Sequence, residues 1–302
     1  MKIVVFYYSQ TGQALKAAKS IVSTMEDTDV VFKAIVPQRH YPFPWGRKAF
    51  FNVFPETRLG LPPSGVEQMD FSDVADADLV MIAGQSWFLS PSLPLQSFFS
   101  DEQVKQYLLG RNILFVNACR NMWLMTSRKI QNCIRTMSAR LVGQIVLQDE
   151  ASNLVSAVTI VRWLLDGKKT ATRFFPAAGI SRVTLNEASR FGTIIEKTWH
   201  ENAINDLQRR LMAAGAIHYK PSVLFLEKAG YRMFGLWAKF IRQRGDIDSP
   251  RRQGRLTIFY YYLIFVLFVL SPFAQLFFWF TYPLHRVSEQ MQKDCYVDNN
   301  LK

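Results

Sequence analysis

A short polar segment near the N-terminus has the composition of an anion-binding loop. Residues 9–14 read SQTGQA and follow the apolar start of the chain, MKIVVFYY. The hydroxyls of Ser9 and Thr11, the backbone N–H groups of a tight turn and the N-terminus of a following helix are all groups that bind phosphate oxygens. Gly12 allows the backbone to approach such a ligand closely. The alternative is an ordinary strand-to-helix turn with a Ser or Thr cap.

The spacing within this segment limits which phosphate ligand it suits. It lacks the length and the Lys-Ser/Thr ending of a nucleotide P-loop, and it does not read G-x-G-x-x-G. We therefore expect a single terminal phosphate rather than a dinucleotide.

Two later segments carry side chains suited to a flat ring. Gln85, Ser86, Trp87 and Phe88 follow an apolar run, and they offer two aromatic rings to cover a ring and two polar groups for its edge. The alternative is an apolar loop packed on its neighbours. Residues 117–123, NACRNMW, follow the next apolar run and supply amides, a thiol and a guanidinium.

Four side chains are candidates for chemistry at such a ring, namely Arg120, Asp149, His40 and Cys119. Arg120 would stabilise negative charge that develops on an enolate. Asp149, which stands beside Glu150 after a further apolar run, is a candidate base, and His40 is the other. The two acids would alternatively be plain helix N-terminal acids.

The cysteines point to no metal site. Cys119 is a candidate reactive thiol, with an inert buried cysteine as the alternative. Together with Cys133 and Cys295 it forms neither a metal-binding pattern nor an even disulfide set, which fits a reducing cytoplasm.

The elements that would position these groups alternate between strands and helices. Continuous apolar runs indicate strands that are buried on both faces, as in parallel sheets. We expect strands at 2–8, 29–35, 79–84, 113–118 and 141–147, and helices at 13–25, 96–109 and 125–138. This predicts an α/β domain over residues 1–150 with a doubly wound, five-stranded parallel sheet, whose ligands bind beyond the carboxyl ends of the strands.

Two segments interrupt or extend this pattern. Residues 37–65 are rich in Pro, Gly and aromatic residues and are predicted to form a wall or lid over the site, or else an ordinary packing insert. Residues 151–218 are predicted to be a helical extension that packs on the first domain. One of its helices should end at Gly167, and a long amphipathic helix should end at Gly215.

The C-terminal third indicates a membrane. The chain of 302 residues carries a formal charge of +12, and residues 219–255 interleave aromatic and basic residues, as amphipathic helices at anionic membrane surfaces do. Residues 256–284 contain no charge and are long enough to span a bilayer, or to form a re-entrant hairpin turning at Ser271-Pro272. Residues 285–302 form a polar tail. The excess of Arg before the apolar segment places the N-terminal domain on the cytoplasmic face of the inner membrane.

The first 150 residues resemble flavodoxins. SQTGQA is similar to the flavodoxin phosphate loop, Ser/Thr-x-Thr-Gly-x-Thr, with Ser9, Thr11 and Gly12 matching and Ala14 standing where a hydroxyl is usual. The resemblance implies a flavodoxin-like fold and FMN as cofactor. The FMN contacts expected from it and from the loops above are Ser9, Gln10, Thr11, Gly12, Gln13, Gln85, Ser86, Trp87, Phe88, Asn117, Cys119, Arg120 and Trp123.

A narrower resemblance covers most of the chain. YYSQTGQ, RHYPFPW, QSWFLSPSLP, CRNMW and VTIVRWLLDGKK are similar to the dialkylresorcinol condensing enzyme family, the DarA-type proteins. The resemblance implies a partner ketosynthase that makes a lipophilic dialkylcyclohexane-1,3-dione, which this chain would aromatise to a 2,5-dialkylresorcinol.

Two other functions remain open at this point. One is a membrane-bound flavodoxin-like electron carrier or quinone reductase, although the insert and the helical region favour a substrate pocket over a bare carrier. The other is a flavin-free scaffold for the ketosynthase, which Ala14 keeps open. Nucleic-acid binding is disfavoured, because the positive charge is concentrated beside the membrane segment and no nucleic-acid motif appears.

Overall fold

The computed structural model describes residues 1–282. The polar tail expected at 285–302, and the last two residues of the apolar segment expected at 256–284, lie outside the described residues.

Five parallel strands form the sheet in the order β2-β1-β3-β5-β6. This is the flavodoxin-like order of a doubly wound sheet, with its switch point between β1 and β3. The predicted fold class is therefore confirmed. The strands are β1 (Lys2–Tyr7), β2 (Asp29–Ala34), β3 (Leu79–Trp87), β5 (Asn112–Cys119) and β6 (Arg140–Gln148).

The third strand is longer than its apolar run predicts. β3 continues to Trp87 because the two-residue strand β4 (Ser90–Pro91) turns back and pairs with it antiparallel. Gln85, Ser86 and Trp87, which we expected in a loop, therefore lie in a β-hairpin.

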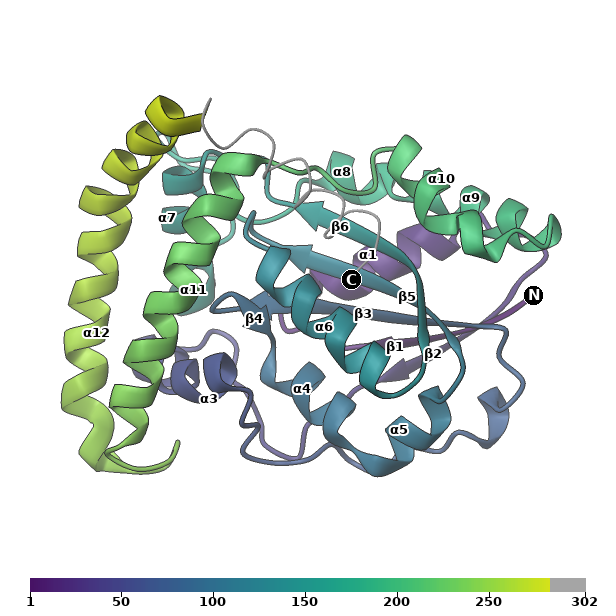
Figure 1. Cartoon of the computed structure of the whole chain (residues 1–302), viewed down its shortest axis with the longest axis horizontal. Helices are drawn as coiled ribbons and strands as arrows, with labels where there is room; N and C mark the ends of the chain where they lie inside the picture. Colours follow the sequence, from purple (N-terminus) through teal and green to yellow (C-terminus); the bar gives the residue numbers. More distant parts are fainter. Residues whose placement is uncertain (283–302) are drawn as a thin grey trace.

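Helices cover both faces of the sheet (Figure 1). Alternate strand residues such as Val5 and Phe6 enter two separate cores, one on each face. On the first face lie α1 (Gln13–Val22), α8 (Arg182–Glu187), α9 (Ser189–His200), η2 (Ile204–Asp206) and α10 (Leu207–Ala213). On the second face lie η1 (Ser72–Val74), α4 (Leu93–Ser100), α5 (Glu102–Leu108) and α6 (Leu124–Thr136).

Two predicted helices are broken in the structure. The helix expected at 96–109 divides at Asp101, whose carboxylate accepts the Val104 N–H and so caps α5. The long helix expected before Gly215 divides into α8, α9, η2 and α10. Periodicity alone did not reveal these breaks, because the pieces of each broken helix keep their apolar faces toward one core, the second-face core for α4 and α5 and the first-face core for α8 to α10.

The 37–65 insert contains two short helices, α2 (Arg47–Asn52) and α3 (Phe54–Leu59). An isolated bridge between Pro37 and Val66 brings its two ends together. Its aromatic side chains pack on the β3–β4 hairpin and on the C-terminal helices. The insert therefore lies between the carboxyl edge of the sheet and these helices.

Three further helices lie at the carboxyl edge of the sheet. α7 (Asn153–Asp166) ends at Gly167, as predicted, and Gly167 is left-handed. α11 (Pro221–Arg242) and α12 (Gln253–Phe265) run side by side beyond the ends of β5 and β6 (Figure 1), and η3 (Pro250–Arg252) precedes α12.

The last helix is continuous through the Ser271-Pro272 pair. A π-helical turn, η4 (Val266–Leu270), follows α12, and the helix then continues to residue 282. The turn lies just before Pro272, where a helical N–H is missing. A re-entrant hairpin at this pair is therefore wrong. Pro250–Tyr282, hereafter the apolar helix, has 33 residues and is the one helix within residues 1–282 long and apolar enough to cross a membrane.

Candidate functional site

The polar segment after β1 forms an open turn at the start of α1. Gly12 is left-handed, with φ +79°, and the space where a Cβ would stand is empty to 4 Å. Ser9 Oγ accepts the Leu15 N–H at 3.2 Å, and the Lys16 N–H makes the helical bond to Gly12 O. The N–H groups of the first helical turn that precede Leu15 have no partner within the helix, and such groups bind anions. Thr11 is half-buried beside them.

The neighbours of this turn fix its shape. The Gln13 side chain is buried and exchanges two hydrogen bonds with the backbone of Ile180. Gln13 therefore holds the 167–180 segment in place, rather than facing outward as a ligand contact. Gln10 donates to Pro42 O of the insert and approaches Gln85 at 3.4 Å. Ala14 is fully buried in the core, so its side chain does not line the turn.

Lys16, a residue of the first turn of α1, and Arg182 both lie near Lys169. Lys169 Nζ lies 4.9 Å from the ring of Trp163, and that ring contacts Gly179, next to Gln13. Burial lowers the pKa of Lys169, and the nearby positive charges of Lys16 and Arg182 lower it further. A bound anion would relieve this repulsion.

The β3–β4 hairpin holds the aromatic pair that sequence placed over a ring. Phe88 and Leu89, its two turn residues, both have positive φ, 45° and 60°. Bulky residues adopt this conformation only under strain, and such strain is concentrated at functional sites. Trp87 is nearly buried against Trp45 and Tyr41, and the Phe88 ring lies 4.9 Å from that of Phe50. Both rings are thus covered by the insert.

Three buried hydrogen-bond donors around this hairpin lack partners within residues 1–282. They are Tyr41 Oη, Trp45 Nε1 and Asn117 Nδ2. The oxygen of the Asn117 amide accepts from Ser86 Oγ at 3.2 Å, so its NH₂ group is the unused side. Buried donors are rarely left unpaired in folded proteins. Tyr41 and Trp45 pack on Trp87, and Asn117 contacts Ser86 of the same hairpin, so the three donors would suit a ligand with several acceptor atoms.

The loops after β5 and β6 bring three sequence candidates together. The Asp149 N–H donates to Cys119 O and Arg120 O, and the Asp149 carboxylate accepts from Ser156 Oγ and the Ala151 N–H. Burial lowers the pKa of Arg120 to about 10, although the nearby Asp149 carboxylate opposes that shift. Burial raises the pKa of the Cys119 thiol well above its usual range, so the reactive thiolate does not form at neutral pH.

A carboxylate that sequence reasoning missed completes this group. Glu227 of α11 is fully buried and accepts the Leu124 and Met125 N–H groups at 3.2 and 2.7 Å, at the N-terminus of α6. Trp123, expected to contact the cofactor, is buried just before this helix end. Burial raises the pKa of Glu227 to about 7, although the backbone hydrogen bonds and Arg120 oppose the shift. The sequence did contain a signal for this residue, because Glu227 is the only acidic residue between Asp206 and Asp246.

Glu227→Gln should flatten the pH dependence of stability. The folded-state pKa of about 7 lies above the reference value of 4.5, so the native state holds more protons than the unfolded state between these pH values. The wild-type free energy of unfolding should therefore fall by on the order of 3 kcal/mol from pH 4.5 to 7 through this group. Denaturant unfolding at pH 5 and pH 8 should show the variant losing less stability than the wild type. An equal loss in both proteins would contradict this assignment.

Other candidates lie apart from this group. His40 is exposed on the insert, and its neighbour Arg39 pairs with Asp248. A cavity of about 310 Å³ lies between α2 and α12, and one of about 620 Å³ lies between the end of the insert and α4. Neither is lined by residues 9–14. No group of three His, Cys, Asp or Glu side chains in residues 1–282 could hold a metal ion.

Comparison with known proteins finds similar structures but no similar sequences or sequence families. No family model and no curated protein sequence matches this chain. A flavodoxin from the domain Archaea is similar at 13% identity and a TM-score of 0.38, covering 66% of this chain and 98% of that one. A WrbA-like flavodoxin from Agrobacterium tumefaciens gives 11% identity and 0.40, with coverage of 66% and 98%. A flavoprotein in complex with FMN from Lactobacillus acidophilus gives 18% and 0.40, with coverage of 48% and 92%. At these values the similarity does not bear on ligand or activity, and the flavodoxin-like fold rests on the strand order.

Proposed function

We propose that this chain is a membrane-attached, FMN-dependent oxidoreductase. The observation that supports it best is the pairing of two features at one edge of the sheet. An outward-facing helix end suited to a phosphate stands at the switch point, and three unpaired buried donors surround the neighbouring hairpin. FMN carries both a terminal phosphate and a ring edge with acceptor atoms, so it matches both.

The residues that would hold this cofactor differ in part from those expected from sequence. Ser9, Thr11 and Gly12 would bind the phosphate with the N-terminus of α1, and Lys169 would balance its charge. Tyr41, Trp45 and Asn117 would donate to the ring edge. Bound flavin would supply the two-electron oxidation, accepting a hydride from the substrate.

The proposed substrate is a dialkylcyclohexane-1,3-dione made by a partner ketosynthase, and the product is a 2,5-dialkylresorcinol. This conversion removes one proton and one hydride. The Arg120 guanidinium would stabilise the enolate oxygen that forms as the proton leaves. The pKa of Glu227, about 7, suits it to accept that proton at neutral pH, and Asp149 is a second carboxylate near Arg120. A lipophilic diketone would reach the enzyme from the cytoplasmic face of the inner membrane.

One assay tests this proposal. Purified protein loaded with FMN is incubated with a synthetic 2,5-dialkylcyclohexane-1,3-dione in air, and the product is identified by mass. We expect the mass to fall by two hydrogens, with the absorbance of a resorcinol. No conversion by flavin-loaded protein would overturn the aromatase and leave the electron carrier or quinone reductase. Failure to bind flavin at all would leave the flavin-free scaffold.

A further inference from the structure

Most of the apolar helix is exposed, and the protein covers it at only a few positions. Its exposed large apolar side chains are Ile258, Tyr261, Ile264, Phe265, Phe268, Val269, Leu270, Phe273, Leu276, Phe277, Trp279 and Phe280. Phe268, Val269 and Leu270 are consecutive, so the exposed apolar surface extends around most of the helix. By contrast, Phe259 is fully buried, and Phe278, nineteen positions later, is only 3% exposed. The protein therefore covers one side of this helix near both of its ends.

The covering element is α11, which runs antiparallel to the apolar helix. The Trp237 ring lies 5.6 Å from that of Phe259, and the Phe225 ring lies 5.4 Å from that of Phe278. The stretch between Phe259 and Phe278 is about 28 Å long at 1.5 Å per residue, close to the thickness of a bilayer core.

This pairing is incompatible with a bilayer crossing. α11, which packs on the apolar helix, carries Lys228, Arg232 and Lys239, and it is joined to the sheet domain. Glu227 accepts hydrogen bonds at the start of α6, and Arg58 donates to Tyr231 O at 2.7 Å. A spanning orientation would carry these charges and the adjoining domain into hydrocarbon, where charges are costly and irregular backbone has no partners.

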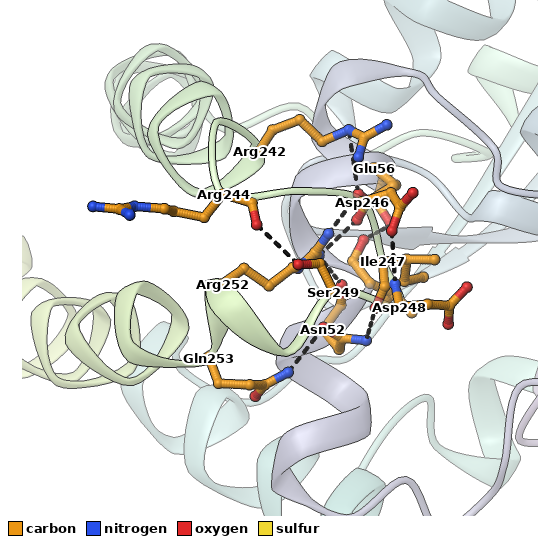
Figure 2. Close-up of polar contacts among 12 residues, drawn as sticks. Asn52, Glu56, Arg242, Arg244, Asp246, Ile247, Asp248, Ser249, Arg252 and Gln253 are labelled. Carbon is orange, nitrogen blue, oxygen red and sulfur yellow. Dashed lines mark hydrogen bonds and ion pairs between the residues drawn. The ribbon is translucent and has the colours of Figure 1, made fainter.

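The connection between the two helices is fixed rather than hinged. Figure 2 shows Arg252 paired through two hydrogen bonds, at 2.7 and 2.8 Å, with Glu56 of α3. Asn52 donates to Ile247 O at 2.6 Å, and Arg39 pairs with Asp248. The apolar helix therefore keeps its position against the insert.

The charge of this surface identifies what covers it. No acidic residue occurs from Lys228 to Gly245, and none from Ser249 to Tyr282. The cations in the same stretch that are not fully buried are Lys228, Arg232, Lys239, Arg242, Arg244, Arg251 and Arg255. A second copy of the chain would bring like charges together, whereas an anionic bilayer complements both the charge and the exposed apolar surface.

The cavity of about 310 Å³ at the start of α12 suits a lipid headgroup. Arg47 and Lys48 line it together with apolar Phe51, Leu256 and Tyr260. The Arg47 guanidinium lies 5.1 Å from the centre of the Tyr260 ring, and neither cation forms an ion pair in the described part of the chain. Two unpaired cations above an apolar floor match a phosphate with acyl chains below it.

We propose that α11 and the apolar helix lie in the plane of one leaflet of an anionic bilayer, with Arg47 and Lys48 holding a lipid phosphate, and that the helix does not cross. This refines the membrane attachment in the proposed function but does not require flavin. Failure of the diketone assay therefore leaves it standing.

The depth of the apolar helix tests its orientation. Ile258→Cys, Phe268→Cys and Phe280→Cys are made singly, with Cys133 and Cys295 replaced by Ser, and each is spin-labelled in phosphatidylglycerol vesicles. All three side chains are exposed, at 56%, 47% and 84%. We expect the three labels to show similar shallow depths in power-saturation measurements. A label at 268 near the bilayer centre, with 258 and 280 at opposite surfaces, would overturn the in-plane orientation.

Vesicle binding tests the headgroup site. Arg47→Gln with Lys48→Gln should weaken binding to phosphatidylglycerol vesicles about tenfold or more, since each cation at the surface contributes about 1 kcal/mol. Lys19→Gln with Arg140→Gln, at the opposite edge of the sheet, should change it less than about twofold. Equal losses in both pairs would show diffuse attraction only and overturn the headgroup site. Equal wild-type binding to phosphatidylcholine vesicles would overturn the choice of an anionic bilayer.

Discussion

Arg252→Ala should destabilise the chain by about 3 kcal/mol, because it leaves a buried carboxylate without its main partner. Arg252 is fully buried and Glu56 is 2% exposed. The guanidinium also donates to Asn52 O, so the same change removes a bond to the insert backbone (Figure 2). Arg242, with its Nε 3.6 Å from Glu56 Oε1, remains as a weaker partner and keeps the loss near the lower end of the range for buried pairs. Denaturant unfolding of the detergent-solubilised protein measures the effect.

Two matched variants separate the buried charge from general damage. Glu56→Leu with Arg252→Leu removes both charges and should recover most of the lost stability, since no unpaired ion remains. Lys105→Ala breaks the exposed pair with Glu102 and should cost less than about 1 kcal/mol. If Arg252→Ala lowered the free energy of unfolding no more than Lys105→Ala, the buried pair would not hold the insert to α11 and the apolar helix.

The sheet and the open turn after β1 were predictable because their signals are local. Most of the parallel strands contain a continuous apolar run, and the turn lies between such a run and an amphipathic helix, within about 20 residues. The position of Gly12 at the helix start follows from its freedom to adopt positive φ. These features depend on residues close together in the sequence, so the pattern of apolar and polar residues is enough to predict them.

The environment of the ring site was not predictable, because it is assembled from distant segments. Phe88 and Leu89 have positive φ, although neither is a residue that signals such a turn, and the pairing of β3 with β4 imposes it. The ring centre of Trp45, in the insert, lies 5.0 Å from that of Trp87, in β3. Glu227 reaches α6 from about 100 positions away in sequence. No periodicity within one segment encodes such contacts.

The apolar segment shows the same limit in another form. Its length and composition are those of a membrane-spanning helix, and by those criteria the sequence prediction was sound. Composition does not show which other helix packs against this one. The contact of Phe278 with Phe225 of α11 shows that the protein covers one face of the helix even near its far end. Orientation relative to a bilayer depends on that contact and not on hydropathy.

Ser9→Asp with Thr11→Asp should empty the proposed flavin site, with the largest expected effect on binding. Two carboxylates at the start of α1 would face the dianionic phosphate, and each charge pair at about 4 Å costs about 4 kcal/mol at an effective dielectric constant of 20. Affinity should fall by at least about a thousandfold, seen as loss of flavin absorbance in the purified protein. The fold should persist, because a carboxylate at position 9 still accepts the Leu15 N–H that Ser9 Oγ accepts now.

The neutral pair Ser9→Asn with Thr11→Asn is the matched control for this loss. An amide keeps the acceptor at position 9 without adding charge, so it should retain a large part of the flavin. Retention of flavin by the Asp pair would place the phosphate elsewhere, and the cations around Lys169 would then need another ligand. Loss of flavin by both pairs alike would mean that side-chain shape, rather than charge, governs the site. Only loss confined to the Asp pair supports a phosphate held at the N-terminus of α1, because only there does added negative charge meet the anion directly.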